Sequence, residues 1–416
     1  MIQSFIDKCF FVILVVFLVF AIILYSAIGF LYTDELCAAA FFLLFLYIVF
    51  KTPPWSFNKV FLLTLFVFLF YTIYSLWIGS NTKRAIFNDL VVQLKPYLAF
   101  FCAYQLKPSI SESRKRMLRN ICLIFWLAFL LPIGLISLVY EKIIILTMGI
   151  PASYGIAVIL ISLCYYYCSK YTLRDRIIFL CLLTIGIFSG RSKFYGFFVL
   201  AAFMMLFFYN TDRIKINLKN TLIIVGMVVV IVLVAWQKIS YYFYDAISGS
   251  AEADKDMMAR YILYAISPEI LKDYFPFGSG LASFATNASG AISYSSIYGK
   301  YGIDAVWGLS KNYHDFVSDS YYPALAQFGV VGVILYLSFW IYIVRKIITY
   351  YKRTKNRDYT IIGLLIVGFL AIEGTTAATF IMQGGFFVMM LLGMILSCTP
   401  KETQLTEYEE NTVGVY

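Results

Sequence analysis

The stretch CFFVILVVFLVFAIILYSAIGFL, residues 9–31, carries no charged side chain. A helix needs about 20 apolar residues to cross a bilayer, so this run predicts a membrane span. It is too long for the core of a signal peptide and lacks a small-residue cleavage site, so we expect a retained signal anchor. The whole chain is 62% hydrophobic and only 13% charged, with a mean hydropathy of +0.82. These values exclude an ordinary soluble domain and predict an all-α polytopic membrane protein.

Further apolar runs follow along the chain, and about twelve crossings are expected in total. They are centred near residues 9–31, 36–50, 60–78, 87–106, 121–140, 154–168, 177–189, 194–210, 221–237, 323–344, 360–379 and 385–398.

The net charge of +10 comes mainly from short connections between the predicted spans. The two largest groups are 107–119 and 345–357, and both fall on the inner side if the N-terminus is cytoplasmic. Such an excess of Lys and Arg on inner loops follows the positive-inside rule. The charge therefore reports topology, with both termini cytoplasmic, and does not predict nucleic-acid binding.

One long polar segment, Lys238–Tyr322, interrupts the apolar pattern and is expected to face outward, in the periplasm of a bacterium. It divides the chain into membrane helices at 1–237, the outer loop at 238–322, further membrane helices at 323–398 and an acidic cytoplasmic tail at 399–416. A transporter has no need of such a loop, whereas an enzyme acting on a lipid-anchored substrate does.

Within the loop, Ala251–Asp273 predicts a partly amphipathic helix in which Pro268 can produce a kink. Pro276-Phe-Gly-Ser-Gly280 predicts a turn whose glycines permit a close backbone approach. Residues 281–312 are expected to be irregular. Asp319 or Ser320 is expected to cap the next span.

No cysteine lies in the loop, so no disulfide framework is expected there. The chain has a single histidine and no CxxC or HExxH motif, which excludes a histidine-rich metal site. We therefore expect neither a metal nor another cofactor.

Three basic residues are candidates for binding an anionic group. Arg191 and Lys193 lie in a tight outer turn, Ser189-Gly-Arg-Ser-Lys193, against the positive-inside tendency. Arg260 lies among apolar residues in the loop helix, and its guanidinium geometry suits phosphate. As an alternative, the two cations of the turn could simply extend to the membrane interface. Arg260 could instead form an ion pair with Asp256.

Acids and further polar groups complete the candidate list. His314 is a natural general base because its ordinary pKa lies near neutrality, and it stands close to Asp315 and Asp319. Ionisable groups at membrane depth usually mark function or a pairing. Those groups are Asp89 and Lys95 in the fourth span and Glu373 in the eleventh, and a Lys95–Glu373 pair is the favoured structural reading. Lys83 and Arg84 add outer positive charge.

Three stretches together resemble the bacterial O-antigen polymerase and ligase superfamily. They are Ser189-Gly-Arg-Ser-Lys193, Arg260 followed by Pro276-Phe-Gly-Ser-Gly-Leu281, and the segment from Asp319 to Gly332 that ends in a G-x-x-G pattern. With the topology, the resemblance covers most of residues 177–345.

The resemblance implies a metal-independent, membrane-embedded glycosyltransferase with a GT-C-like arrangement of helices. The donor would be a glycan on undecaprenyl diphosphate, with arginines holding the diphosphate and an acceptor hydroxyl attacking with inversion. Expected partners are the lipid-linked donor and acceptor, membrane lipid, and a chain-length regulator and a flippase of the same pathway. The protein would reside in the bacterial plasma membrane.

One departure separates the two branches of the superfamily. Ligases place a histidine where this chain has Ser318, and His314 lies one helical turn upstream. The stretch Asp319-Ser-Tyr321 is instead similar to polymerases, so a Wzy-type polysaccharide polymerase is expected and Tyr321 joins the candidates. An O-antigen ligase and a lipid-linked oligosaccharide flippase remain the alternatives, and His314, Asp319 or neither could be the base.

Overall fold

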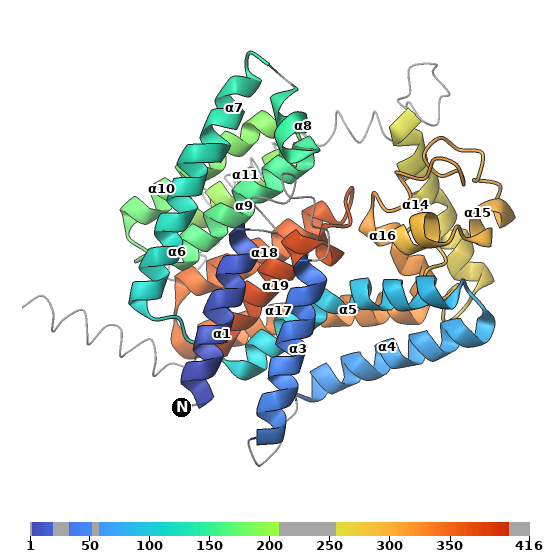
Figure 1. Ribbon diagram of the computed structural model, residues 1–416, viewed down its shortest axis with the longest axis horizontal. Coiled ribbons are helices and arrows are strands. Elements are labelled where there is room, and N and C mark those ends of the chain that lie inside the picture. Colours follow the sequence, from blue (N-terminus) through green and yellow to red (C-terminus); the bar gives the residue numbers. More distant parts are fainter. Residues whose placement is uncertain (1, 20–32, 52–57, 141, 208–254, 399–416) are drawn as a thin grey trace, which may run out of the picture.

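All regular structure in the described part of the chain is helical, and no strand occurs there (Figure 1). The computed structural model describes residues 2–19, 33–51, 58–140, 142–207 and 255–398. The predicted span at 221–237, the loop residues 238–254 and the acidic tail lie outside the described residues, as does much of the 9–31 run.

The described helices fall into two groups along the chain, before and after residues 208–254. The first half of the chain contains α1 (Ile2–Val16), α3 (Thr33–Lys51), α4 (Lys59–Ile78), α5 (Lys83–Leu106), α6 (Glu112–Phe125), η2 (Trp126–Leu130), α7 (Leu131–Ser137), α8 (Ile143–Met148), α9 (Pro151–Tyr167), α10 (Leu173–Thr184), η3 (Ile185–Ser189) and α11 (Ser192–Phe207). The second half contains α14 (Lys255–Asp273), η5 (Ala288–Ile292), α15 (Ser296–Lys300), α16 (Tyr321–Ala324), η6 (Leu325–Phe328), α17 (Gly329–Thr354), α18 (Arg357–Glu373), η7 (Thr379–Ile381) and α19 (Gln383–Ser397).

Four described helical stretches are long and apolar enough to cross a membrane: Ile2–Val19, Lys59–Ile78, Glu112–Ser137 and Tyr321–Thr354. Three shorter apolar helices lie at Pro151–Tyr167, Ser192–Leu206 and Gln383–Ser397. Exposed apolar side chains such as Trp77 and Val139 lie on two of the long stretches or directly beside them. The predicted all-α architecture with several apolar helices is confirmed in this form.

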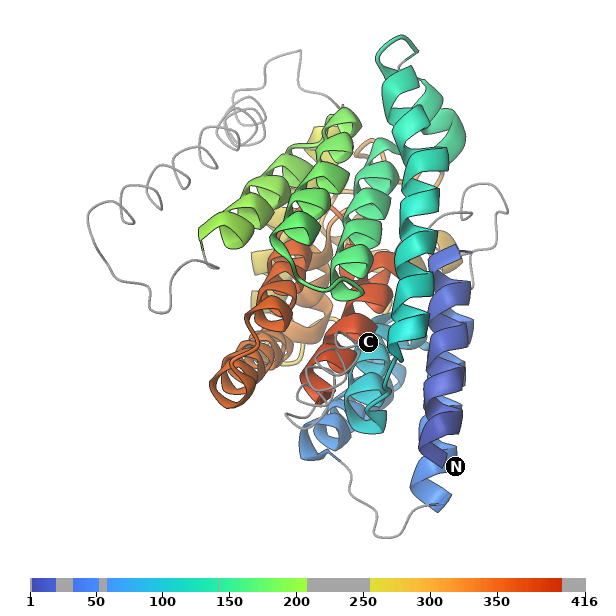
Figure 2. The ribbon, with the colours of Figure 1, turned by 90° about the vertical axis from the view of Figure 1, so that its left-hand side faces the viewer.

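The bundle is centred on α19, which is buried along almost its whole length and packs against α5. A Cβ atom on Gly393 would come within 2.4 Å of the Phe100 carbonyl oxygen, so glycine permits this close approach. On another side of the core, α11 lies alongside α18 (Figure 2).

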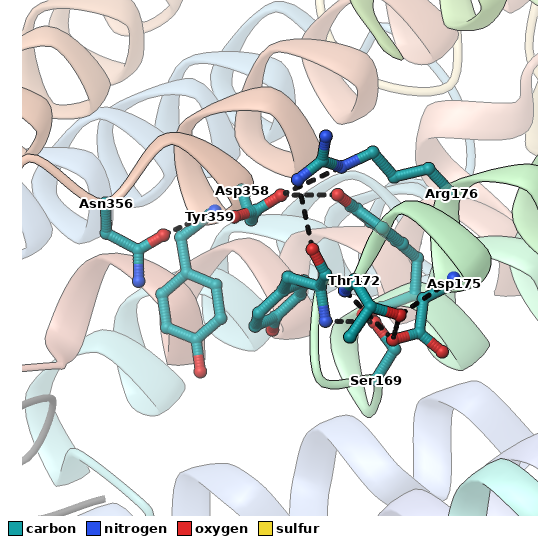
Figure 3. A network of polar contacts seen from close by, with 9 residues as sticks. Ser169, Thr172, Asp175, Arg176, Asn356, Asp358 and Tyr359 are labelled. Atoms are coloured by element: carbon teal, nitrogen blue, oxygen red, sulfur yellow. Dashed lines mark hydrogen bonds and ion pairs between the residues drawn. The ribbon is translucent and has the colours of Figure 1, made fainter. Parts of the chain in front are cut away.

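A polar network joins the α9–α10 turn to the start of α18 (Figure 3). Arg176 Nε lies 3.9 Å from Asp358 Oδ1, and the Tyr166 hydroxyl donates to the same oxygen at 2.5 Å. Thr172 and Asp175 form a capping box at the start of α10. This network fixes the start of α18, which is the end remote from the 255–322 segment. The turns at this end of the bundle are rich in Lys and Arg.

The described part of the polar segment gathers at the opposite end, beside the turn between α4 and α5 (Figure 1). Ser80 Oγ donates to the Leu281 carbonyl at 2.8 Å. Asn81 Nδ2 donates to the carbonyls of Ala282 and Ser293 at 2.6 and 2.8 Å. Side chains of one turn thereby satisfy carbonyl groups that irregular backbone would otherwise leave unpaired.

The predicted glycine turn at Pro276–Gly280 is confirmed, and its neighbour is the start of α17. Gly278 and Gly329 have φ angles of 82° and 64°. A Cβ on Gly278 would lie 2.2 Å from the Gly329 nitrogen, and one on Gly329 would lie 2.3 Å from the Gly278 nitrogen. The two backbones can therefore touch only because both residues are glycine.

The predicted loop helix is observed as α14, which runs from Lys255 to Asp273 with Pro268 inside it. Ser320 occupies the cap position before α16, but its hydroxyl makes no capping hydrogen bond, so the expected side-chain cap is absent there. The irregular stretch 281–312 includes the short helical turns η5 and α15.

Candidate functional site

The turn before α11 presents two cations near Asp319 of the polar segment. Gly190 adopts a left-handed conformation, with φ of 62°, and ends η3. Arg191 follows, with its backbone nitrogen donating to Ser189 Oγ at 3.4 Å, and its carbonyl accepts the first hydrogen bonds of α11. Lys193 lies in the first turn of that helix.

Lys193 pairs with Glu373, the last residue of α18. Its Nζ lies 2.6 Å from Glu373 Oε2, and Thr379 Oγ1 donates to the same oxygen at 2.9 Å. The exposed fractions of the two side chains are only 12% and 4%. The expected Lys95–Glu373 pair is therefore wrong, because a cation of α11 occupies that carboxylate.

Arg260 of α14 pairs with Asp319, which precedes α16. Nε and Nη2 of the guanidinium both contact Asp319 Oδ2. The exposed fractions of the side chains are 17% for Arg260 and 28% for Asp319, so the pair remains accessible. Asp319 is 59 residues away in the sequence. The expected partner Asp256 has its side chain outside the described residues.

These two ion pairs form one charged cluster of Arg191, Lys193, Arg260, Asp319 and Glu373. Burial raises the pKa of Asp319 above its ordinary value of 3.8, and Arg260, Lys193 and Arg191 each act to lower it. All three cations are thus close enough to interact electrostatically with one carboxylate. Three positive and two negative charges leave the cluster cationic, which suits a multiply charged anion.

The backbone after α18 connects the segments that carry the cluster. The Gly374 carbonyl accepts hydrogen bonds from the nitrogens of Tyr321 and Tyr322 at 3.2 and 3.4 Å. The Tyr264 hydroxyl of α14 donates to the Thr375 carbonyl at 2.7 Å. Sequence reasoning missed this turn, since backbone carbonyl groups leave no mark in a sequence pattern.

His314 lies in the irregular part of the polar segment, outside the charged cluster. Its Nδ1 lies 3.3 Å from the Lys311 carbonyl, and its own carbonyl accepts from the Val317 nitrogen. Within the described residues, no hydrogen bond or ion pair joins this side chain to Asp319 or to the three cations.

The other candidates also lie apart from the cluster. Lys95 pairs with Asp34 and with Glu35, the latter at 2.8 Å, in the first turn of α3. Arg84 is exposed in the first turn of α5, beside Lys83. Tyr321 is buried, with its hydroxyl 3.5 Å from Gln93 Oε1.

Asp89 supports the glycine-rich turn instead of binding a cation. Its Oδ2 accepts a hydrogen bond of 2.7 Å from the Ala282 nitrogen, and Gln93 Nε2 lies 3.4 Å from Oδ1. The side chain is fully enclosed. This acid is therefore a structural partner of the loop backbone.

An apolar groove of about 570 Å³ opens between α14, α17 and α18, one helical turn beyond Arg260. Aromatic and aliphatic side chains dominate its walls. It is lined by Tyr264, Ser267, Pro268, Leu271, Tyr322, Pro323, Leu325, Ala326, Val333, Tyr336, Leu337, Trp340, Val367 and Ala371. A cationic cluster beside an apolar groove can accommodate an amphiphile with an anionic head.

Metal-ligand residues do not gather in the described ranges: no group of three or more His, Cys, Asp or Glu side chains there could hold an ion.

Compared with models of protein families and with curated proteins, the sequence gives no match.

Proposed function

We propose that this protein is a Wzy-type polysaccharide polymerase. It would join oligosaccharide repeat units on undecaprenyl diphosphate at the outer face of a bacterial plasma membrane. The observation that carries the proposal is the charged cluster, in which Arg191, Lys193 and Arg260 all act electrostatically on Asp319. The apolar groove begins one helical turn beyond Arg260 on α14 and supports the proposal. The twelve-span topology, with the 238–322 segment outside and both termini cytoplasmic, is part of the same proposal.

In the proposed reaction, the three cations hold the diphosphate of the donor. The acceptor hydroxyl attacks the anomeric carbon from the opposite face, forming the new glycosidic bond with inversion. The bond between the anomeric carbon and the diphosphate oxygen breaks, and the diphosphate leaves with the electron pair. Fixed positive charge stabilises the growing charge on this leaving group, which is the role that a metal ion plays in other enzymes.

Asp319 is the proposed general base and accepts the proton of the acceptor hydroxyl. Its elevated pKa makes it a stronger base than an ordinary aspartate. When a diphosphate takes Arg260, the carboxylate loses its partner in the ion pair and can turn to the acceptor. His314 is not assigned this role, because its described contacts lie within its own loop.

The proposed lipid carrier has an isoprenoid tail, and the apolar groove supports its placement. The groove begins near Tyr264, four residues after Arg260 on α14, and continues between α17 and α18 to Trp340. A tail in the groove would place the diphosphate at the charged cluster.

The surface glycan of a strain lacking this chain, separated by size on a gel, tests the proposal. A polymerase predicts loss of the ladder with a single repeat unit still attached to the lipid core. Loss of all attached glycan, with polymer accumulating on undecaprenyl diphosphate, would instead identify an O-antigen ligase.

One observation favours a candidate of another class, a lipid-linked oligosaccharide flippase. Lys95, Asp34 and Glu35 form a largely buried charged group between α3 and α5, and buried charges in a helical bundle are typical of transport pathways. An unchanged glycan profile in the deletion strain would contradict the polymerase function. Transport would then be the preferred hypothesis.

A further inference from the structure

Glu373 is the most enclosed charge of the cluster, and the proposed chemistry gives it no direct part. Its side chain is only 4% exposed, and one oxygen, Oε2, accepts from both Lys193 and Thr379. A buried carboxylate beside an anion site opposes the binding of an anion by Coulomb repulsion. Its position therefore needs a reason other than charge.

The surrounding backbone supplies that reason. Glu373 ends α18, and its own carbonyl accepts from the nitrogens of Thr376 and Ala377. The next two residues carry the carbonyls that hold Tyr321, Tyr322 and Tyr264. The turn after α18 thus contacts the segments that carry Asp319 and Arg260, while the Glu373 side chain contacts Lys193.

The far end of α18 is also fixed. Asp358, in its first turn, contacts Arg176 and the Tyr166 hydroxyl (Figure 3). With both ends held, Glu373 has little freedom to shift along the helix axis. A carboxylate held in this way can confine the flexible four-carbon side chain of Lys193 to one position.

We propose that Glu373 is a positioning residue that holds Lys193 against the anionic head group of the substrate. The inference rests on the proposed function for the identity of that head group, a diphosphate. By this proposal the two hydrogen bonds to Oε2 matter for ligand binding, and the negative charge of Glu373 does not.

Binding of inorganic pyrophosphate to the purified protein in lipid nanodiscs tests the proposal. Glu373→Gln removes the charge but keeps an oxygen that can accept from Lys193 and Thr379, so its affinity should match or exceed that of the wild type. Glu373→Ala removes both, and its affinity should fall about 10-fold or more, the usual size for losing a charge-assisted hydrogen bond. Glu269→Ala, on the exposed face of α14, is the matched control and should bind as the wild type does.

The proposal also requires that Glu373 acts on pyrophosphate binding only by holding Lys193. In a Lys193→Met background, Glu373→Ala should cause no further loss of pyrophosphate affinity, because the two residues act as a unit. If Glu373→Ala does not fold, Glu373→Asp replaces it, since the shorter acid keeps the charge but withdraws the oxygen from Lys193. Equal affinity of the Ala and Gln variants, additive losses with Lys193→Met, or tight binding by the Asp variant would each overturn the proposal.

A separate assay distinguishes failure of the proposed function. The purified wild type is incubated with lipid-linked repeat units, and the products are sized. If pyrophosphate binds with the expected pattern but no units are joined, polymerisation is wrong and the role of Glu373 stands. If the wild type binds no pyrophosphate, the positioning role is overturned directly.

Discussion

Arg260 stands on a helix face with apolar neighbours and meets a carboxylate from a distant part of the chain. A guanidinium binds phosphate with the same bidentate geometry that it uses for a carboxylate, so a phosphate group can take the place of Asp319. Each residue of the cluster is unremarkable alone. The arrangement of three cations around Asp319 gives the site its chemical character.

Replacement of Arg260 tests the anion-binding role. Arg260→Ala removes one of three cations from the site of the growing charge and should lower the rate of polymerisation by about 100-fold or more. Arg191→Ala should have an effect of the same order. Lys272→Ala, an exposed cation on the same helix as Arg260, should leave polymerisation unchanged. Full activity of the Arg260 and Arg191 variants, with normal amounts in the membrane, would contradict the role.

The pH profile tests the identity of the base. Because burial raises the pKa of Asp319, kcat/KM should fall as the pH decreases through a value above 3.8, when the carboxylate becomes protonated. Asp319→Asn should lose about 100-fold in kcat or more. His314→Ala should keep both the rate and the acid limb, and loss of that limb would transfer the role to the histidine.

The raised pKa of Asp319 also determines how its contribution to the free energy of unfolding changes with pH. The folded protein holds the Asp319 proton more tightly than the unfolded chain does. The contribution of this residue to the free energy of unfolding is therefore greatest below pH 3.8, and it decreases as the pH rises through the elevated pKa. The ionised form of Asp319 thus costs stability at pH values above its pKa, as expected where a charge is placed for binding a ligand.

At the scale of elements, α14 is common to both features, since it carries Arg260 of the charged cluster and contributes one wall of the groove, with α17 opposite. The interlocked glycines at 278 and 329 bring the loop backbone directly onto the start of α17. Because α14 and α17 both line the groove, this contact supports the packing of the segment that carries Arg260 against the start of α17.

Filling the groove tests its role in binding the lipid. Val333→Trp adds a large side chain to the wall contributed by α17 and should raise KM for the lipid-linked donor by about 10-fold, with a smaller effect on kcat. Ile341→Trp, on an exposed position of the same helix, is the control and should leave KM unchanged. A KM for Val333→Trp equal to that of the wild type would show that the tail lies elsewhere.

At the scale of the whole molecule, charge is segregated between the two ends of the bundle. The turn between α9 and α10 and the turn between α17 and α18 are rich in Lys and Arg, whereas the 255–322 segment gathers at the other end (Figure 1). The proposed topology places these ends on opposite sides of the membrane.

Labelling of single cysteines tests that topology. The eight natural cysteines are first replaced by alanine. Asn312→Cys and Arg353→Cys then place one exposed thiol at each end. A membrane-impermeant maleimide should label the first in intact spheroplasts and the second only after lysis. Labelling of both, or the reverse order, would contradict the proposed orientation.

The sequence predicted the helices well, because an apolar run that must bury its backbone polar groups has few alternatives to a helix. It also singled out Arg191 and Lys193 by their turn, Arg260 by its apolar neighbours, and Asp319 by its place near His314 and in the stretch similar to polymerases. Which of these cations pairs with which acid could not be predicted from the sequence. Lys193 and Glu373 are 180 residues apart, so helix packing, and not spacing along the chain, decides which cation meets which acid. The Lys95–Glu373 expectation was wrong for this reason.

The Arg260–Asp319 pair also has a consequence for turnover. Asp319 is an anion tethered beside the cation that holds the leaving group, so it competes with the spent carrier for the guanidinium. This internal competition lowers the affinity for the product. It does not weaken the stabilisation of charge during bond cleavage, because the carboxylate is then accepting the acceptor proton. Under the proposed mechanism, Asp319 passes its proton to water, and the carboxylate then re-forms its ion pair with Arg260 and displaces the emptied carrier. Asp319→Asn should therefore retain spent undecaprenyl diphosphate more tightly than the wild type does.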